Sequence, residues 1–156
     1  MNAATAALLA AFRALPMTER ILANLRPGVP RKVGGLWGGS AGLLLAVLQQ
    51  HWRGQLLVST ADDLDSLQLR ADLLSFGGSA HVLPRQETDD LGLPEPQSRS
   101  ERSRALLQHR DDGAPLLAGI EALLQPAPLP KTLGQGRLEL RAGEPCDREL
   151  LLQQAA

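Results

Sequence analysis

The sequence predicts an α/β fold in which a parallel sheet carries helices on both faces. Short apolar runs that suit buried strands alternate along the chain with helical segments, as they do in βαβ units. Three such runs lie at residues 55–60, 79–83 and 114–118. An apolar content of 44% over 156 residues is enough for one domain with a core. Because aromatic residues make up only 3%, Leu, Ala and Val must fill most of that core.

Three helices and a long connection are expected before the first strand. Residues 3–15 are rich in Ala and Leu and predict a helix. Residues 18–25 predict a second, short helix with Thr18 as its N-cap. The prolines and glycines of residues 26–35 indicate a connection, and a further helix is expected to end near Trp52.

Two longer helices are expected between the strands. Residues 62–76 predict an amphipathic helix whose apolar face consists of Leu64, Leu67, Leu69, Leu73, Leu74 and Phe76. Residues 84–97 are polar, contain three prolines and predict a loop. The pattern from Ser98 to Glu101 matches a capping box, so we expect a helix from Ser98 to about His109.

The last part of the chain indicates a domain boundary. A short helix is expected at 119–124, followed by a proline-rich, extended break at 125–131, a strand at 137–141 and a helix at 147–154. We expect the chain to end inside its next structural unit. The predicted division is an N-terminal helical extension at 1–32, an α/β subdomain at 33–130 and an incomplete following domain at 131–156.

Charge and cysteine content favour a protein of the cytoplasm without a membrane partner. The formal net charge of −1 argues against a dedicated nucleic-acid-binding domain, which is usually strongly basic. Because Cys146 is the only cysteine, an internal disulfide and a Cys-rich zinc site are excluded. The apolar N-terminal run is too short and too interrupted to cross a membrane.

The most informative motif resembles a phosphate loop that lacks the lysine and the Ser/Thr needed to bind phosphate and Mg²⁺. When the pattern G-x-x-x-x-G-K-[ST] is laid on the chain from Gly35, Ala41 replaces the lysine and Gly42 replaces the Ser/Thr. The lysine normally reaches the phosphates and the hydroxyl holds Mg²⁺. We therefore predict a P-loop-NTPase-like (RecA-like) subdomain with a degenerate phosphate loop, without catalytic residues and without a bound cofactor. The loop residues are Gly35, Gly38, Gly39, Ser40, Ala41 and Gly42.

Two other functions remain open for this loop. Residues 38–42 also read G-x-S-x-G, the nucleophile elbow of α/β hydrolases, with Ser40 as nucleophile. His81 or His109 would then supply the base. A helix N-terminus can also bind phosphate through its amides alone, which favours a nucleotide-binding regulatory domain.

Charged side chains offer weaker candidate sites. Asp62, Asp63 and Asp65 follow an apolar run, where a metal-binding acid can lie, but acids in a first helical turn also complement the helix dipole. We expect the dipole role, and we expect no metal site. The acids of the 84–97 loop are expected to be solvated. Four residues are candidates for contact with a partner: Trp37, Arg99, Arg102 and Arg110.

Four segments together resemble the N-terminal UvrB-like region of the bacterial transcription-repair coupling factor (Mfd) family. They are the lysine-less loop and helix at 35–46, the strand and polar turn at 55–63, the Leu-Pro-x-x-Glu-Thr stretch at 83–88 with its Ser-Glu-Arg at 100–102, and the strand, turn and Ala-Leu-Leu-Gln-Pro stretch at 115–126. The family has an aromatic residue before the Glu-Thr, where this chain has Gln86.

The resemblance implies a non-catalytic scaffold within a DNA-repair protein. Such a protein is an ATP-driven DNA translocase that releases stalled RNA polymerase and recruits nucleotide excision repair. The implied partners are the other domains of the same protein and, for the full-length protein, UvrA, RNA polymerase and DNA. The motor domains that hydrolyse ATP in this family have no counterpart in the chain.

Overall fold

The computed structural model describes residues 2–128 and 130–135. Internal contacts divide the chain into two units, residues 1–126 and residues 127–156. The first unit holds the sheet, and the second contributes the described helix α7 (Pro130–Gln135). The predicted strand at 137–141, the predicted helix at 147–154 and Cys146 lie outside the described residues.

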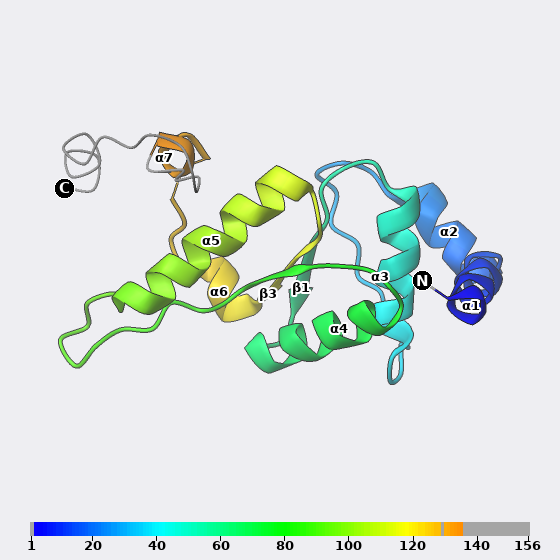
Figure 1. Ribbon diagram of the computed structural model, residues 1–156, viewed down its shortest axis with the longest axis horizontal. Helices are drawn as coiled ribbons and strands as arrows, with labels where there is room; N and C mark the ends of the chain where they lie inside the picture. Colours follow the sequence, from blue (N-terminus) through cyan, green and yellow to red (C-terminus); the bar gives the residue numbers. More distant parts are fainter. Residues whose placement is uncertain (1, 129, 136–156) are drawn as a thin grey trace, which may run out of the picture. The chain divides into compact units, whose positions relative to one another are not determined.

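Three parallel strands form the sheet of the first unit (Figure 1). The order is β1-β3-β2, with β1 at Leu57–Thr60, β2 at His81–Leu83 and β3 at Leu116–Gly119. Val58 of β1 and Val82 of β2 are both in register with Leu117 of β3. All four residues of β3 are buried, as expected for the central strand of a parallel sheet. The prediction of an α/β fold with a parallel sheet is confirmed.

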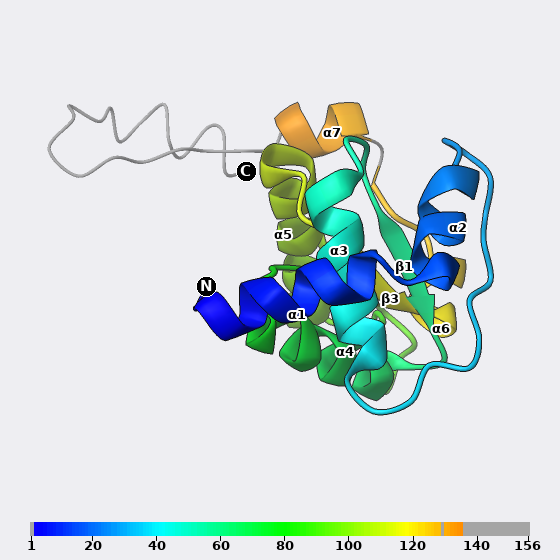
Figure 2. The ribbon, with the colours of Figure 1, turned by 90° about the vertical axis from the view of Figure 1, so that its right-hand side faces the viewer.

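Helices connect and flank these strands. They are α1 (Ala3–Arg13), α2 (Pro16–Asn24), α3 (Ser40–His51), α4 (Asp63–Ser75), α5 (Pro96–Asp112) and α6 (Ile120–Leu124). A short connection turns the chain back between α3 and β1, so α3 runs in the opposite direction to β1 (Figure 2). The start of α3 therefore lies toward the carboxyl ends of the strands.

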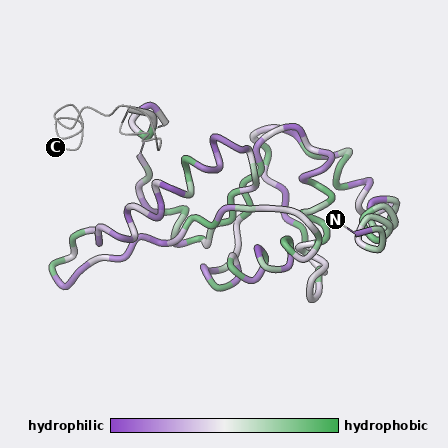
Figure 3. The backbone as a smooth tube through the Cα atoms, in the orientation of Figure 1, coloured by the Kyte–Doolittle hydropathy of each residue, from purple (hydrophilic) through white to green (hydrophobic). Residues whose placement is uncertain are grey.

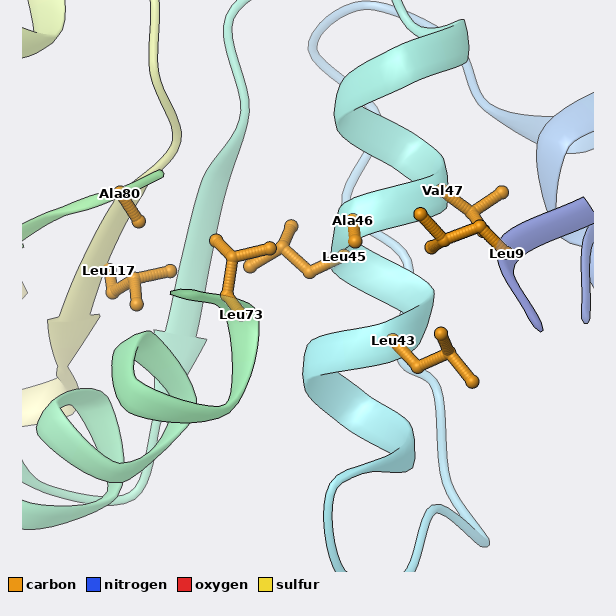
Figure 4. Close-up of a cluster of buried hydrophobic side chains, with 8 residues drawn as sticks. All are labelled: Leu9, Leu43, Leu45, Ala46, Val47, Leu73, Ala80 and Leu117. Atoms are coloured by element: carbon orange, nitrogen blue, oxygen red, sulfur yellow. The ribbon is translucent and has the colours of Figure 1, made fainter. Parts of the chain in front are cut away.

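Helices cover both faces of the sheet, as predicted. Successive side chains of β3 point to opposite faces. On one face, Leu117 joins a buried cluster with side chains from α1, α3 and α4 (Figure 4). On the other face, Leu116 and Ala118 join a second cluster with Ala105 of α5 and Ala122 of α6.

The N-terminal helices belong to the same packed unit. Leu9 of α1 lies in the same buried cluster as Val47 of α3 (Figure 4). The prediction that Thr18 caps α2 was wrong, because Pro16 occupies the first turn and the helix begins there. Proline suits that position, since its missing N–H would have no partner in the helix. Thr18 is instead fully buried, and its hydroxyl has no hydrogen-bond partner among the residues that the structure describes.

The leucines of α4 do not form one apolar face. Leu73 is fully buried, and Leu69 and Phe76 pack against the same cluster. Three other leucines of the predicted face are more than half exposed: Leu64, Leu67 and Leu74. At 100° per residue these three point away from the buried side. The helix thus carries apolar residues on two opposite sides.

Two other predicted boundaries were wrong. Helix α5 begins at Pro96, so Ser98 lies inside its first turn and does not cap it. Ser98 is buried, and its hydroxyl donates to the Glu95 carbonyl oxygen at 3.0 Å. The proline-rich break ends earlier than predicted, because Pro130 begins α7.

Candidate functional site

The glycine-rich loop before α3 forms a tight local turn. Gly35 and Gly38 have φ values of 75° and 52°, in the left-handed region that favours glycine. The Ser40 amide donates to the Trp37 carbonyl oxygen at 3.2 Å, and the Trp37 amide donates to the Ser40 hydroxyl at 2.8 Å. The Ser40 side chain therefore closes the turn on which the helix starts.

Gly42 of α3 lies in close contact with α4. A Cβ atom at Gly42 would lie 2.6 Å from Cβ of Asp72 and 2.9 Å from the backbone nitrogen of Leu73. Real Cβ atoms essentially never show such distances. At the Ser/Thr position of the phosphate-loop pattern, the neighbouring helix therefore leaves little room for a side chain.

No strand precedes this loop in the described residues from Leu25 to Gly39. A phosphate loop and a nucleophile elbow both need a strand, a turn and a helix in sequence. Only the turn and the helix are present here. The loop has the shape of a helix start, without the strand that would aim it at a substrate.

The two candidate bases lie at the other end of the sheet from Ser40. His81 opens β2, and its Nε2 lies 2.7 Å from Oδ2 of Asp112. Nδ1 of His109 lies 2.6 Å from the Ala114 carbonyl oxygen, just before β3. Both are near the amino ends of strands, while Ser40 begins α3 toward the carboxyl ends (Figure 2). The geometry does not support the hydrolase alternative.

Two of the three aspartates after β1 accept structural hydrogen bonds, and Asp65 lies in the first turn of α4. Asp62 caps α4, since its carboxylate accepts a hydrogen bond from the Asp65 amide at 2.8 Å. Asp63 accepts one from the Arg85 amide at 2.9 Å and so joins the ends of β1 and β2. Among the described residues, no group of three His, Cys, Asp or Glu side chains is arranged to hold a metal ion.

Arg102 is buried and does not share an exposed face with Arg99 and Arg110. Only 2% of Arg102 is exposed, whereas Arg99 is exposed and Arg110 pairs with Asp111 at 2.9 Å. Burial lowers the pKa of Arg102, and the negative charge of Asp63 partly opposes this shift. The prediction that Arg102 contacts a partner was wrong, because α5 turns it toward the sheet.

The Arg102 guanidinium joins three segments that follow the sheet. It donates to the carbonyl oxygens of Pro84 at 2.6 Å, Ala122 at 3.2 Å and Pro126 at 3.3 Å. Its Nη1 also lies 3.4 Å from Oε1 of Gln125. The five donors of a planar guanidinium suit several carbonyl oxygens at once. Arg102 therefore fixes the chain after β2 and after α6 to α5.

Gln125 and Ser98 complete this network, and sequence reasoning missed both. Oε1 of Gln125 accepts from the Gln86 amide at 2.5 Å, and its Nε2 donates to the Gln86 carbonyl oxygen at 3.0 Å. The Ser98 hydroxyl accepts from the Glu87 amide at 3.1 Å. These partners lie 39 and 11 residues apart along the chain, so no local pattern indicates them.

The two tryptophans differ in their surroundings. Trp37 is 86% exposed at the tip of the glycine loop, as expected for a residue available to a partner. The indole nitrogen of Trp52 is buried beside Gly54 and has no hydrogen-bond partner in the described part of the chain. Trp37 is therefore the more accessible of the two.

No helix in the described part of the chain is long and apolar enough to cross a membrane.

Comparison with known proteins identifies no relative. No protein-family model, no curated protein and no solved structure matches the sequence or the fold.

Proposed function

We propose that this chain is a non-catalytic, P-loop-NTPase-like scaffold, of the kind found in the N-terminal UvrB-like region of transcription-repair coupling factors. The parallel sheet with helices on both faces supports the comparison with P-loop proteins, and the glycine loop at the start of α3 departs from them because no described strand precedes it. The four sequence segments described above support the comparison with that family.

The close contact at Gly42 carries the non-catalytic part of the proposal. A working phosphate loop places a Ser or Thr hydroxyl on Mg²⁺ at this position. Any side chain at Gly42 would collide with Asp72 and Leu73 of α4. The position serves close contact between α3 and α4, so a hydroxyl restored there by substitution would destabilise the unit.

The other residues of the glycine loop also offer no charged side chain to a phosphate. The Ser40 hydroxyl accepts a hydrogen bond from the Trp37 amide, and Ala41 provides no positive charge for a phosphate. Phosphoryl transfer depends on positioning and on electrostatic stabilisation of the transferred group. A loop without the lysine and without a metal ligand neither positions the transferred phosphoryl group nor stabilises its charge.

In this proposal the activity belongs to the whole repair protein and the chain supplies a rigid part of it. The full-length protein would be an ATP-driven translocase acting on DNA and stalled RNA polymerase and recruiting UvrA. The described unit would hold neighbouring domains in place. The Arg102 network, which fixes three segments to α5, gives it the rigidity that such a role needs.

Calorimetric titration with Mg-ATP tests the loss of nucleotide chemistry. The chain is expected to give no saturable heat, and the Ala41→Lys variant is expected to give none either, because Gly42 still lacks a hydroxyl. The intrinsic fluorescence of Trp37 and Trp52 should stay unchanged in both titrations. Saturable micromolar binding by the natural chain would contradict the scaffold proposal and favour a nucleotide-regulated domain.

Strand-specific repair tests the role in DNA repair. In the native cells, the codons for residues 33–126 are deleted in frame, and ultraviolet damage is followed on the two strands of a transcribed gene. The transcribed strand is expected to lose its faster repair. Equal rates of strand-specific repair in the deletion and the parent would remove the repair assignment but leave the fold comparison standing.

A further inference from the structure

Two leucines are displayed at the tip of the loop between β2 and α5. We call residues 86–95 the acidic loop. Leu91 is 83% exposed and Leu93 is 59% exposed. Figure 1 shows the loop reaching beyond the first turn of α5. Single exposed leucines are common on protein surfaces, but two on one projecting loop form a small apolar tip.

The acidic loop is held in shape by its own hydrogen bonds. Asp89 is the centre of this arrangement: its carboxylate accepts from the amides of Leu91 at 2.9 Å and Leu93 at 2.8 Å. The Asp89 amide donates to the Leu93 carbonyl oxygen, and Gly92 turns the chain with a φ of 76°. The backbone under both leucines is therefore fixed before any partner binds.

The base of the acidic loop is anchored to the body of the unit. Gln125 holds both backbone groups of Gln86, and the buried Ser98 holds the Glu87 amide. Arg102 holds Pro84 just before the loop. An anchored, internally bonded loop loses little freedom on binding, so it can bind with a small contact area.

The charge of the acidic loop is of one sign. It contains four acids and no Lys, Arg or His; the acids are Glu87, Asp89, Asp90 and Glu95. The carboxylates of Glu87 and Asp90 are exposed and make no ion pair within the described residues. Figure 3 shows hydrophilic and hydrophobic residues side by side along this loop.

We propose that the acidic loop is a docking element that inserts Leu91 and Leu93 into an apolar pocket of a partner protein whose rim carries Lys or Arg. The two exposed leucines can be buried in an apolar pocket, and the surrounding carboxylates attract a positively charged rim. The same carboxylates repel the phosphates of nucleic acids and of anionic lipid surfaces. The proposal does not depend on the glycine loop or on the repair assignment.

Site-specific photocrosslinking in the native cells tests the proposal. Leu91 is replaced by the photoreactive amino acid benzoylphenylalanine in the full-length chain. The matched control carries the same group at Leu124, which is 81% exposed but lies in α6 outside the loop. Mass spectrometry identifies the attached molecule and the peptide at the point of attachment.

The expected result is a protein product from position 91 that is absent from position 124. The attached peptide should contain apolar residues beside Lys or Arg. The double variant Glu87→Lys, Asp90→Lys should lower the yield at least about tenfold, equivalent to roughly 1.4 kcal/mol. With the partner then purified, Leu91→Asp should weaken binding by a similar factor while leaving the melting temperature of the chain unchanged.

Other results would overturn the proposal. One is the same products from positions 91 and 124, and another is attachment to nucleic acid, lipid or a second copy of the chain. A third is a crosslinking yield that does not change in the double variant Glu87→Lys, Asp90→Lys. Asp89→Ala separates the role of loop shape from that of the displayed leucines. It keeps both leucines but removes the acceptor for their amides, so weaker binding is expected, and unchanged binding would contradict the fixed-loop argument.

Discussion

Arg102 donates a 2.6 Å hydrogen bond to the carbonyl oxygen of Pro84, 18 residues earlier in the chain. This contact joins α5 to the end of β2, and the same guanidinium reaches Ala122 and Pro126. One side chain thus holds together the segments that follow two strands of the sheet. The buried charge is tolerated because several carbonyl oxygens surround it.

Arg102→Ala is expected to lower the free energy of unfolding by about 3 kcal/mol. The substitution leaves the carbonyl oxygens of Pro84 and Ala122 without their donor, and hydrogen bonds to charged groups typically contribute roughly 1.5–3 kcal/mol. Urea denaturation followed by circular dichroism measures the loss. Arg99→Ala, on the exposed side of the same helix, is the control and should change stability by less than about 0.5 kcal/mol. Equal effects of the two variants would contradict the anchoring role.

Gly42→Ser is expected to destabilise the first unit by about 1–2 kcal/mol. The new Cβ would collide with Asp72 and Leu73, and overpacking typically costs about 1–3 kcal/mol, partly offset by the better helix propensity of a non-glycine residue. The urea concentration at the unfolding midpoint should fall, while the dependence of the free energy of unfolding on urea concentration should not change. Gly34→Ser is the control, because no atom of the described residues lies within 4 Å of its Cβ position. A Gly42→Ser chain as stable as the parent would show that α3 and α4 can separate freely.

Truncation of Leu73 should destabilise the chain much more than truncation of Leu67. Leu73→Ala removes a fully buried side chain and should cost about 2–5 kcal/mol. Leu67 is 51% exposed on the other side of α4, so Leu67→Ala should cost less than about 1 kcal/mol. Thermal denaturation of both variants under the same conditions gives the comparison. A similar cost for both would mean that the outer side of α4 is covered in solution.

The contact between Asp112 and His81 predicts a loss of stability in acid. Burial acts to raise the pKa of Asp112, but hydrogen bonds from the Ala114 amide and His81, with the charges of His81 and His109, hold it below its ordinary value. A carboxyl group whose pKa is lower in the folded state stabilises the fold above its unfolded pKa of about 3.9, and this contribution is lost as the pH falls below that value.

Asp112→Asn should therefore flatten the acid limb of the stability curve. The parent chain should lose stability more steeply than the variant below about pH 4. The free energy of unfolding, measured by urea titration at several pH values from neutral to acid, gives both curves. Parallel curves for parent and variant would contradict a stabilising role of the Asp112 carboxylate.

Local patterns predicted the sheet well. The runs at 55–60 and 79–83 contain β1 and β2, the run at 114–118 contains all of β3 except Gly119, and the glycine stop after Phe76 marks the end of α4. These features follow from short-range properties: strand-forming apolar runs between polar turns, and glycine after the last helical turn. Strand order is set by contacts far apart in sequence, and the sequence patterns predicted none.

The misplaced residues share a physical cause. Arg102 and Ser98 are polar, so a sequence pattern places them at the surface or at a cap, whereas both are buried among backbone groups. The leucines of α4 show the converse, since Leu64 and Leu67 are apolar yet exposed. Burial depends on what packs against a helix, which its own sequence does not encode. The resemblance to a repair protein and the scaffold role stay predictions.

Shape and specificity are encoded by different residues in the acidic loop. Asp89 and Gly92 set the path of the backbone, while Leu91 and Leu93 point out of it without supporting the fold. Substitutions at the two displayed positions can therefore change what the loop recognises while its framework stays intact. Such a loop can diverge quickly between related proteins, and it offers a place where a new binding preference can be engineered without redesigning the sheet beneath it.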